Sequence, residues 1–326
     1  MSFEIPKVEN PSVYLDVAFK KARNKASQKR TSLKADRLRK SKVLEFIKID
    51  TVNDTLNSKL VKIISSFPNF DNLTEFYTEL VKTLIDYKEL KKSLGAMNWA
   101  KNKIADFSKQ YRTKIRKCNE LLVIRRYGKE YYGRISSVIK QISKNLYFLE
   151  ETRKIMREFP SVKDGLFTVA IFGFPNIGKT TLLSKLTTSK PEIKPYAFTT
   201  KKLNIGYLQH KHRKIQFIDT PGSLNRLDKM NSIEKTAYLA VKYCAHTIVY
   251  IYDLTESYPL KDQKKLLKKL KEFDKPIIIY LSKTDIIDKE KTSAFKHSNK
   301  GVVVQISTLK NKIIEEFNNY HDEETS

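Results

Sequence analysis

The string GFPNIGKT, residues 173–180, directly follows the apolar run LFTVAI, and it limits the folds open to this chain more than any other feature. Gly173 and Gly178 flank four residues and permit a close backbone approach that a Cβ would block. Such a turned backbone points several N–H groups at one anion, and the start of the next helix adds its positive end. The Lys179 ammonium adds a point charge, and the Thr180 hydroxyl is an oxygen ligand that suits Mg²⁺. The pattern therefore predicts a phosphate-binding loop.

The residues on either side support this interpretation over its alternative, a glycine-bearing turn in some other α/β unit. An apolar strand is predicted over 166–172, and a helix with leucines on one face is predicted over 179–188. Strand, glycine loop and helix in this order are the context that the motif requires. We therefore expect a nucleoside triphosphate as the ligand.

The string IQFIDTPG, residues 215–222, bears on the metal. It is an apolar strand that ends in Asp219, and a carboxylate at the end of a neighbouring strand serves Mg²⁺ in P-loop enzymes. The N–H of Gly222 can then contact the γ-phosphate. ATPases share this strand-terminal aspartate, so the string does not distinguish ATP from GTP.

The string IIIYLSKTD, residues 277–285, bears on the base. The Asp285 carboxylate can accept two hydrogens from guanine, whereas adenine lacks a matching pair of donors and would leave a buried carboxylate unpaired. The stem of Lys283 can lie along the base plane. An ordinary polar loop after a strand is the alternative, and the position of the string, one strand-helix unit after the Asp219 strand, favours guanine.

Two weaker strings complete the series. In VVVQISTLK (302–310), Ser307 and Thr308 fall where a loop would lie behind the base, although Ser-Thr after a strand is also typical of a helix cap. In KPYAFTTKK (194–202), a threonine can close over Mg²⁺ and the γ-phosphate when the triphosphate is bound, with a solvated turn as the alternative.

Residues 161–326 are predicted to form an α/β domain, because apolar strands alternate with helices along this half of the chain. We expect a mostly parallel six-stranded sheet with helices on both faces, and the motif loops at the carboxyl ends of the strands. The predicted strands are 166–172, 203–208, 214–219, 247–253, 276–281 and 302–306.

Residues 1–160 are predicted to form an all-α bundle, because apolar side chains recur there at helical spacing and the faces must bury one another. The four faces are Val52, Leu56, Leu60, Ile63 and Phe67; Leu73, Phe76, Tyr77, Leu80, Val81, Leu84 and Leu90; Trp99, Ala100, Ile104, Phe107, Tyr111 and Ile115; and Tyr131, Ile135, Val138, Ile142, Leu146 and Leu149. Breaks are predicted at Pro68-Asn69, at Gly95, and at Gly128 with Gly133.

The formal net charge of +27 at pH 7 is the second large constraint. Basic residues are densest from Lys20 to Lys42, where Asp36 is the only acid, and a second cluster runs from Arg112 to Arg134. A solvated surface is the ordinary reading of such runs, but an excess this large favours nucleic acid as a partner. An anionic membrane is a lesser option, since no strongly hydrophobic face accompanies the first run.

Composition points to a globular protein of the cytoplasm. Hydrophobic residues make up 40% of the 326, and no apolar stretch reaches the length of a membrane span. The N-terminus lacks the pattern of a signal peptide. Cys118 and Cys244 have no metal or redox spacing, which fits a reducing compartment, and the five histidines are scattered.

Taken in order, GFPNIGKT, YAFTT, DTPG, SKTD and IST resemble the translation-factor-like GTPases, and within them the Obg-like group. The resemblance is strongest to the nucleolar GTP-binding protein family in its archaeal form, whose members assist assembly of the large (50S) ribosomal subunit. Residues 67–104 and 131–142 resemble the helical region of that family, so the resemblance covers nearly the whole chain.

The resemblance implies a role for each matching residue. The phosphates would be held by Asn176, Gly178, Lys179, Thr180 and Thr181. Mg²⁺ would be held by Thr180, Thr200 and, through water, Asp219. Guanine would be read by Lys283 and Asp285, with Ser307 and Thr308 behind the base. Catalysis would rest on Lys179, Thr200 and Gly222, the last of these sensing the γ-phosphate.

The implied activity is hydrolysis of GTP to GDP as a conformational switch, with ribosomal RNA and the large subunit or its precursor as partners. We expect a monomer off the ribosome and no membrane. Two departures stand out: Ser282 replaces the usual asparagine, and Ser223 replaces the first of two hydrophobic residues after DTPG. No glutamine is placed to orient water, so slow intrinsic hydrolysis is expected, helped by a ribosomal partner or by K⁺ near Asn176. The alternatives are an RNA-binding scaffold with a decayed nucleotide site and a P-loop ATPase of another class.

Overall fold

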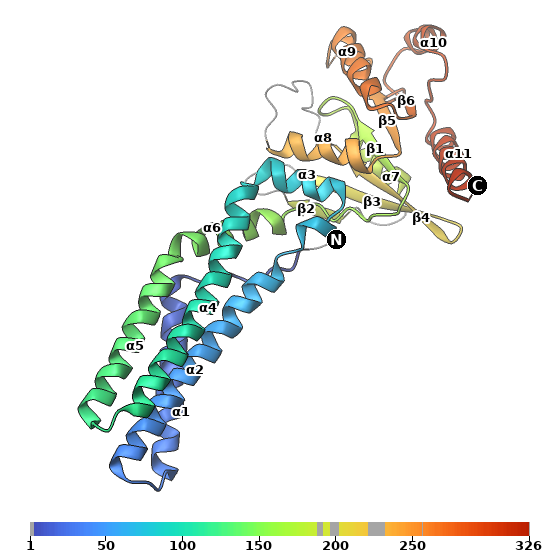
Figure 1. Cartoon of the computed structure of the whole chain (residues 1–326). Coiled ribbons are helices and arrows are strands. Elements are labelled where there is room, and N and C mark those ends of the chain that lie inside the picture. Colours follow the sequence, from blue (N-terminus) through green and yellow to red (C-terminus); the bar gives the residue numbers. More distant parts are fainter. Residues whose placement is uncertain (1–2, 188–191, 196–201, 221–231, 256, 326) are drawn as a thin grey trace. The chain divides into compact units, whose positions relative to one another are not determined.

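The computed structural model describes residues 3–187, 192–195, 202–220, 232–255 and 257–325 (Figure 1). The chain divides into two compact units. The helical unit consists of Phe3–Asn72 and Ile85–Arg157, and the α/β unit consists of Leu73–Leu84 and the chain from Glu158 onward. This division differs from the sequence-based boundary at residue 160 mainly in the short segment 73–84.

Long helices build the helical unit, and most of them pack side by side (Figure 1). They are α1 (Pro11–Ser32), α2 (Arg37–Ser66), α4 (Tyr87–Lys117), α5 (Leu121–Gln141) and α6 (Ser143–Arg157). Helix α2 starts where the Asp36 carboxylate accepts the N–H of Arg39 at 2.8 Å, and Asp86 accepts the N–H of Glu89 in the same way at the start of α4. These side chains satisfy N–H groups that have no partner inside the helix.

Three of the predicted breaks in the helical unit are wrong. Gly95 lies inside α4, and Gly128 and Gly133 lie inside α5. A mid-helix glycine costs only about 1 kcal/mol relative to alanine, which packing readily outweighs. A Cβ at Gly128 would lie 2.5 Å from the Glu45 carboxylate oxygen, so a larger residue there would require the Glu45 side chain to move.

Most residues of the predicted apolar faces are buried; Leu73, Leu84 and Phe107 are half-buried, and one residue is exposed. Trp99 is 42% exposed, so its assignment to the core is wrong. The buried stripe of α4 runs instead through Met97, Ala100, Ile104, Tyr111 and Ile115. Helix α1 contributes a further face that apolar periodicity did not reveal, since Ala18, Ala22 and Ala26 are small and only weakly hydrophobic.

The α/β unit confirms the predicted fold class, and its strands form one sheet in the order β2-β3-β4-β1-β5-β6. The strands are β1 (Thr168–Phe172), β2 (Glu192–Pro195), β3 (Lys202–His210), β4 (Arg213–Asp219), β5 (Thr247–Tyr252) and β6 (Ile277–Leu281). The helices are α3 (Glu75–Leu84), α7 (Lys179–Leu186), α8 (Ser232–Cys244), α9 (Leu260–Leu270), α10 (Lys289–Ser298) and α11 (Ile306–Thr325). Strands β4, β1, β5 and β6 are parallel, while β3 runs antiparallel to β4 and to β2.

The predicted strand over 302–306 is wrong. Val303 makes a single parallel bridge to Tyr280, and α11 already begins at Ile306. The apolar run is genuine, since Val303 is buried, but it is too short to extend the ladder before the helix starts. The sixth strand is instead β2, which sequence periodicity did not predict.

Helices cover both faces of the sheet. A Cβ on Gly206 in β3 would meet Leu183 and Thr187, so this face of the sheet carries α7. Tyr250 and Tyr252 of β5 lie on the opposite face, as the register from Gly206 through β4 and β1 to β5 requires. There the Tyr250 hydroxyl donates to a main-chain carbonyl of α9 at 2.7 Å, and Tyr252 packs against Phe295 of α10.

Helix α3 belongs to the α/β unit because its contacts are with residues of that unit. It packs on α8, and the buried Tyr77 hydroxyl lies 2.9 Å from the main-chain oxygen of Pro160 and 3.2 Å from that of Val162. Burial raises the pKa of Tyr77 well above its ordinary value, so this hydroxyl stays a proton donor. Across the described ranges, no helix is both long enough and apolar enough to cross a membrane.

Candidate nucleotide-binding site

The loop between β1 and α7 has the backbone shape that its sequence predicts. Gly173, Asn176 and Gly178 have φ angles of 153°, 60° and 93°, all in the region that favours glycine. A Cβ on Gly173 would lie 2.1 Å from Ile177 Cδ1 and 3.0 Å from the Ile251 main-chain oxygen. Glycine is therefore required at 173 by space as well as by conformation. Helix α7 begins at Lys179, directly after the loop.

Lys179 lies inside this loop. Its Nζ donates to the main-chain oxygens of Gly173 at 3.0 Å and of Phe174 at 2.6 Å, and the residue is 8% exposed. Burial lowers the pKa of Lys179 to about 8, while the charge of Asp219 acts in the opposite direction. An ammonium held mainly by neutral carbonyl oxygens in a buried place is poorly compensated, and a phosphate oxygen nearby would stabilise it.

Thr180 and Asp219 meet at the predicted metal position. The Thr180 hydroxyl donates to Asp219 Oδ2 at 2.7 Å, and the Asn204 side-chain amide donates to the same oxygen at 2.9 Å. The other oxygen, Asp219 Oδ1, is buried and has no hydrogen-bond partner among the described residues. Burial raises the pKa of Asp219, against the hydrogen bonds from Thr180 and Asn204.

This donor set fits Mg²⁺. A hydroxyl and a carboxylate are hard oxygen ligands, and the unpartnered Oδ1 is the kind of buried acceptor that a metal-bound water or the metal would satisfy. Thr180 would hold the ion directly, and Asp219 would hold it through water. When bound, Mg²⁺ supplies positive charge next to the phosphate oxygens. Asn204, which the sequence did not single out, would keep the Asp219 carboxylate in place.

The segment after β6 carries the predicted base-reading residues. Ser282 is anchored to the end of β5, because its main-chain N–H and its hydroxyl both donate to the Tyr252 main-chain oxygen, at 2.9 and 3.0 Å. Lys283 has a φ of 54°, an uncommon conformation for a lysine, and its Nζ lies 2.7 Å from Asp253 Oδ2. Asp285 is exposed, so its carboxylate is accessible to a base.

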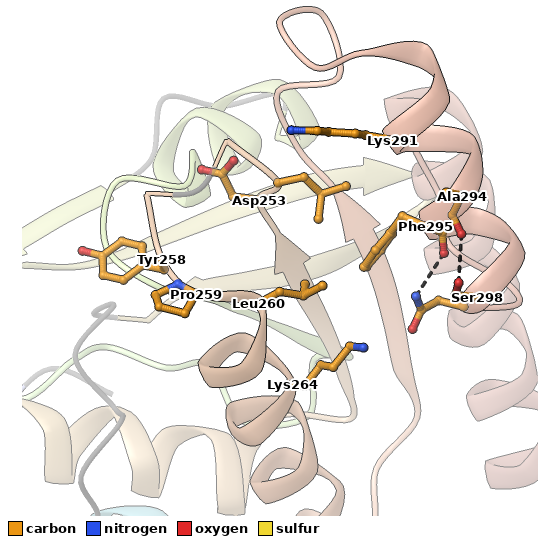
Figure 2. Close-up of a pocket in the computed structure, with 11 residues that line it drawn as sticks. Asp253, Tyr258, Pro259, Leu260, Lys264, Lys291, Ala294, Phe295 and Ser298 are labelled. Carbon is orange, nitrogen blue, oxygen red and sulfur yellow. Dashed lines mark hydrogen bonds between the residues drawn. The ribbon is translucent and has the colours of Figure 1, made fainter.

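The loop after β5 links the phosphate-binding loop to the base-reading segment. At one end, Asp253 pairs with Lys283; further on, the Tyr258 ring packs on the Phe174 ring with centroids 4.7 Å apart. The same loop forms one wall of a cavity of about 560 Å³ between α9 and α10. Figure 2 shows Asp253, Tyr258 and Pro259 on one side of it, with residues of α10 such as Phe295 on the other.

The other predicted site residues fall into two groups. Asn176 and Thr181 are exposed on the phosphate-binding loop and at the start of α7, and Ser307 and Thr308 are exposed in the first turn of α11. Their contacts with a nucleotide stay predictions. Thr200 and Gly222 lie outside the described residues, so the structure does not bear on them.

Sequence reasoning missed Asp253 and Gln263, whose contacts reach the predicted base-reading residue Lys283. Asp253 was detectable, because it directly follows an apolar strand just as Asp219 does. Gln263 carried no such signal. It lies within a lysine-rich helix, and only the fold reveals that its side chain is buried and bonded to the Asp253 main chain.

The basic segments of the helical unit converge at one end, which we call the basic tip. Lys42 Nζ, near the start of α2, donates to the Arg116 main-chain oxygen at 3.0 Å and to Asn119 Oδ1 at 3.3 Å. The α1–α2 and α4–α5 turns therefore lie together, as Figure 1 also shows. Exposed cations of the basic tip are Lys29, Arg30, Lys34, Arg37, Arg39, Arg116 and Lys117.

Two protein families match successive parts of this chain. Residues 3–163 match the family described as NOG1 N-terminal helical domain, and residues 168–283 match the family described as 50S ribosome-binding GTPase. An uncharacterised protein of Methanocaldococcus jannaschii is 38% identical over 78% of this chain and 72% of its own length. Nucleolar GTP-binding protein 1 of Drosophila melanogaster is 32% identical over 74% of this chain.

The chain belongs to the nucleolar GTP-binding protein 1 family. It is a GTP-binding protein of that family, with a P-loop GTPase domain. The chain spans only 38% of the length of the fly protein. A crystal structure of a nucleolar GTP-binding protein 1 from Plasmodium falciparum is 24% identical, covering 51% of this chain and 93% of its own, with a TM-score of 0.41.

Proposed function

We propose that this chain hydrolyses GTP to GDP as a Mg²⁺-dependent conformational switch, and that it associates with ribosomal RNA during assembly of the large ribosomal subunit. The observation that carries the first half is the cluster of Lys179, Thr180 and Asp219. An under-compensated ammonium, a hydroxyl and a carboxylate with one free oxygen lie together at the loop, in a member of a GTP-binding family.

Guanine selectivity would come from Asp285. Its exposed carboxylate follows Lys283 at the carboxyl end of β6, where ligands bind in open α/β sheets. Replacing Asp285 with asparagine exchanges one acceptor oxygen for a donor, so preference should move from GTP toward xanthosine triphosphate. Unchanged GTP affinity in this variant would contradict the assignment of the base pocket.

Turnover is expected to be slow, because no glutamine follows the DTPG string to orient the attacking water. We propose two sources of acceleration, a partner on the ribosome and K⁺ bound beside Asn176, whose left-handed backbone places it at the exposed tip of the loop. Single-turnover rates in potassium and sodium buffers test the second source. Equal rates would remove it.

The RNA half of the proposal rests on the basic tip. Two segments far apart in sequence bring their cations to one end of the helical unit, and such a cluster attracts a polyphosphate backbone. Relatives carry the word nucleolar in their names, and the matching domain family carries the description 50S ribosome-binding. These names support large-subunit particles as the partner to test.

Nucleotide titration separates this function from its alternatives. Calorimetry of the full chain with Mg²⁺ and GTP, GDP or ATP should give tight binding of the two guanine nucleotides and weak binding of ATP. Preference for ATP would favour a P-loop ATPase of another class. Absence of binding would favour the RNA-binding scaffold with a decayed site, an alternative motivated by Ser282.

Co-sedimentation with large-subunit particles tests the ribosomal half, with GDP and a non-hydrolysable GTP analogue compared side by side. A switch predicts a difference between the two nucleotides. Replacing Arg37, Arg39 and Lys40 with glutamine should flatten the salt dependence of RNA binding. The matched control neutralises Lys264, Lys265 and Lys268 of α9 and should leave the slope unchanged.

A further inference from the structure

The Asp253 carboxylate at the end of β5 has two oxygens with different partners. Only 1% of the side chain is exposed. Oδ1 accepts the main-chain N–H and the hydroxyl of Thr255, at 2.8 and 2.7 Å, and so closes a local turn. Oδ2 accepts Lys283 Nζ at 2.7 Å, from a segment thirty residues away in the chain. The local turn needs only one of the two oxygens.

The main chain of Asp253 is fixed from the other side by Gln263. This side chain is 1% exposed; its Oε1 accepts the Asp253 N–H at 3.0 Å, and its Nε2 donates to the Asp253 carbonyl at 2.7 Å. Nε2 also donates to the Tyr258 carbonyl at 3.0 Å, which anchors the rest of the loop. Asp253 is thus held rigidly at the wall of the cavity that Figure 2 shows.

Lys283, in contrast, depends on outside support. Its φ of 54° lies in a sparsely populated region, and 30% of its side chain is exposed. A long lysine side chain loses much rotamer freedom when it is fixed against a ligand. The hydroxyl of the preceding Ser282 donates to the Tyr252 carbonyl, so this short side chain is not available to support Lys283. Among the described residues, Asp253 is the partner that orients the Lys283 side chain.

We propose that Asp253 is a positioning residue for guanine-nucleotide binding: its buried carboxylate holds Lys283 in the orientation in which the lysine stem lies along the base. The inference rests on the proposed function, because it requires a guanine site beside Lys283. Asp253 itself does not touch the nucleotide. Because it acts on the base, which GTP and GDP share, its loss weakens the binding of both by the same factor.

The Asp253→Asn substitution isolates this role. Asparagine keeps an oxygen for Thr255 and turns an NH₂ group toward Lys283, so the turn persists and the pair is lost. Calorimetry of the full chain with Mg²⁺ should give about tenfold weaker binding of GTP and of GDP, with little change in the melting temperature of the nucleotide-free protein. Asp262→Asn, at an exposed position in the first turn of α9, is the matched control and should bind as the wild type does.

A double-mutant cycle shows whether Asp253 acts through Lys283. In a Lys283→Ala background, measured with GDP up to millimolar concentration, the Asp253→Asn substitution should cost less than a further twofold. Equal losses in the two backgrounds would mean that Asp253 acts by another route, and unequal losses for GTP and GDP would place its effect at the phosphates; either result overturns the proposal.

Different experimental results would show that this inference is wrong and that the proposed function is wrong. If the wild type binds GTP and Asp253→Asn binds it equally well, the positioning role is wrong and the GTP site stands. If the wild type binds no guanine nucleotide, both are wrong.

Discussion

The helical unit and the α/β unit each hold a carboxylate that is shielded from solvent and paired with a cation, and the pairs differ in what they connect. In the helical unit, Glu150 pairs with Arg153 one turn along α6, with side chains 15% and 9% exposed. Glu150 also accepts the Val8 N–H at 2.9 Å and so fixes the segment before α1. In the α/β unit, Asp253 pairs with Lys283 across the ends of two strands.

This difference shows that a shielded ion pair can contribute either to stability or to ligand binding. The Glu150 pair ties α6 to the segment before α1, so we expect its free energy to contribute to stability. In our proposal, the Asp253 pair fixes the Lys283 side chain for the base, and Lys179 and Thr180 hold the phosphates. We therefore expect substitution of the shielded Glu150 to change unfolding, and substitution of Asp253 or Lys179 to change nucleotide binding.

The largest expected effect tests the α/β side of this comparison. Lys179→Ala should weaken GTP and GDP binding by at least about 30-fold, because a buried charged contact is worth about 2–5 kcal/mol and about 1.4 kcal/mol is a factor of ten. The melting temperature without nucleotide should change little, since the direct partners of the buried ammonium among the described residues are neutral oxygens. Calorimetry and thermal unfolding measure the two effects, and a large loss of stability with unchanged affinity would reverse the assignment.

The next effect tests the helical side. Glu150→Gln should lower the free energy of unfolding by about 2 kcal/mol, because it disturbs three hydrogen bonds, two of them from the Arg153 guanidinium. Urea unfolding followed by helical circular dichroism measures this change.

The neighbouring pair in α6 is the matched control for that experiment. Glu151 and Lys154 have the same spacing, but their side chains are 59% and 49% exposed. Glu151→Gln should cost no more than about 0.5 kcal/mol. GTP affinity should not change in either variant, and weaker GTP binding in Glu150→Gln would break the comparison.

The pH dependence of the Glu150 contribution follows from its pKa. Burial opposes ionisation, but the hydrogen bonds from Arg153 and from the Val8 N–H outweigh it and hold the pKa of Glu150 below its ordinary value of 4.5. A lowered pKa means that the contribution is fully present above pH 4.5 and is lost as the pH falls through the pKa of the folded state. The stability difference between wild type and Glu150→Gln should therefore shrink as the pH falls below 4.5, and a constant difference would count against this prediction.

The smallest expected effect concerns two glycines of α5. A Cβ on Gly133 meets nothing within 4 Å, so Gly133→Ala should stabilise the protein by about 0.5–1 kcal/mol through helix propensity. At Gly128 the added Cβ would press on the Glu45 carboxylate, which is 11% exposed and paired with Lys48, so Gly128→Ala should lose that gain. Equal melting temperatures for the two variants would show that Glu45 moves aside freely.

The sequence predicted the fold class and the proximity of Lys179, Thr180 and Asp219 at the candidate site, because those features depend on local chemistry. The glycines and Lys179 of the phosphate-binding loop, and the aspartate at the end of the next parallel strand, lie where their spacing placed them. The apolar stripes of the long helices are buried for the same reason, since helical periodicity alone decides which residues share a face.

Features that depend on neighbours distant in the chain escaped the sequence. Gly128 was predicted to break a helix, but it lies inside α5, where Glu45 of another helix lies against it. Trp99 was predicted to be in the core, but the helices that pack on α4 bury a different set of its residues. The run 302–306 reads as a strand, although only Val303 finds room beside β6 before α11 begins.

By itself, the sequence determined a helical region followed by a nucleotide-binding α/β domain. Both follow from the hydrophobic periodicity and the short motifs, which depend only on residues close together in the chain. Tertiary structure alone decided that Gln263 hydrogen-bonds to the Asp253 main chain and that Asp253 pairs with Lys283. It also decided that Lys42 bonds to the α4–α5 turn, which brings the two basic segments together at the basic tip. The physical reason is that a hydrogen bond or ion pair needs both partners within about 3 Å, and only the folded chain sets that distance for residues far apart in sequence.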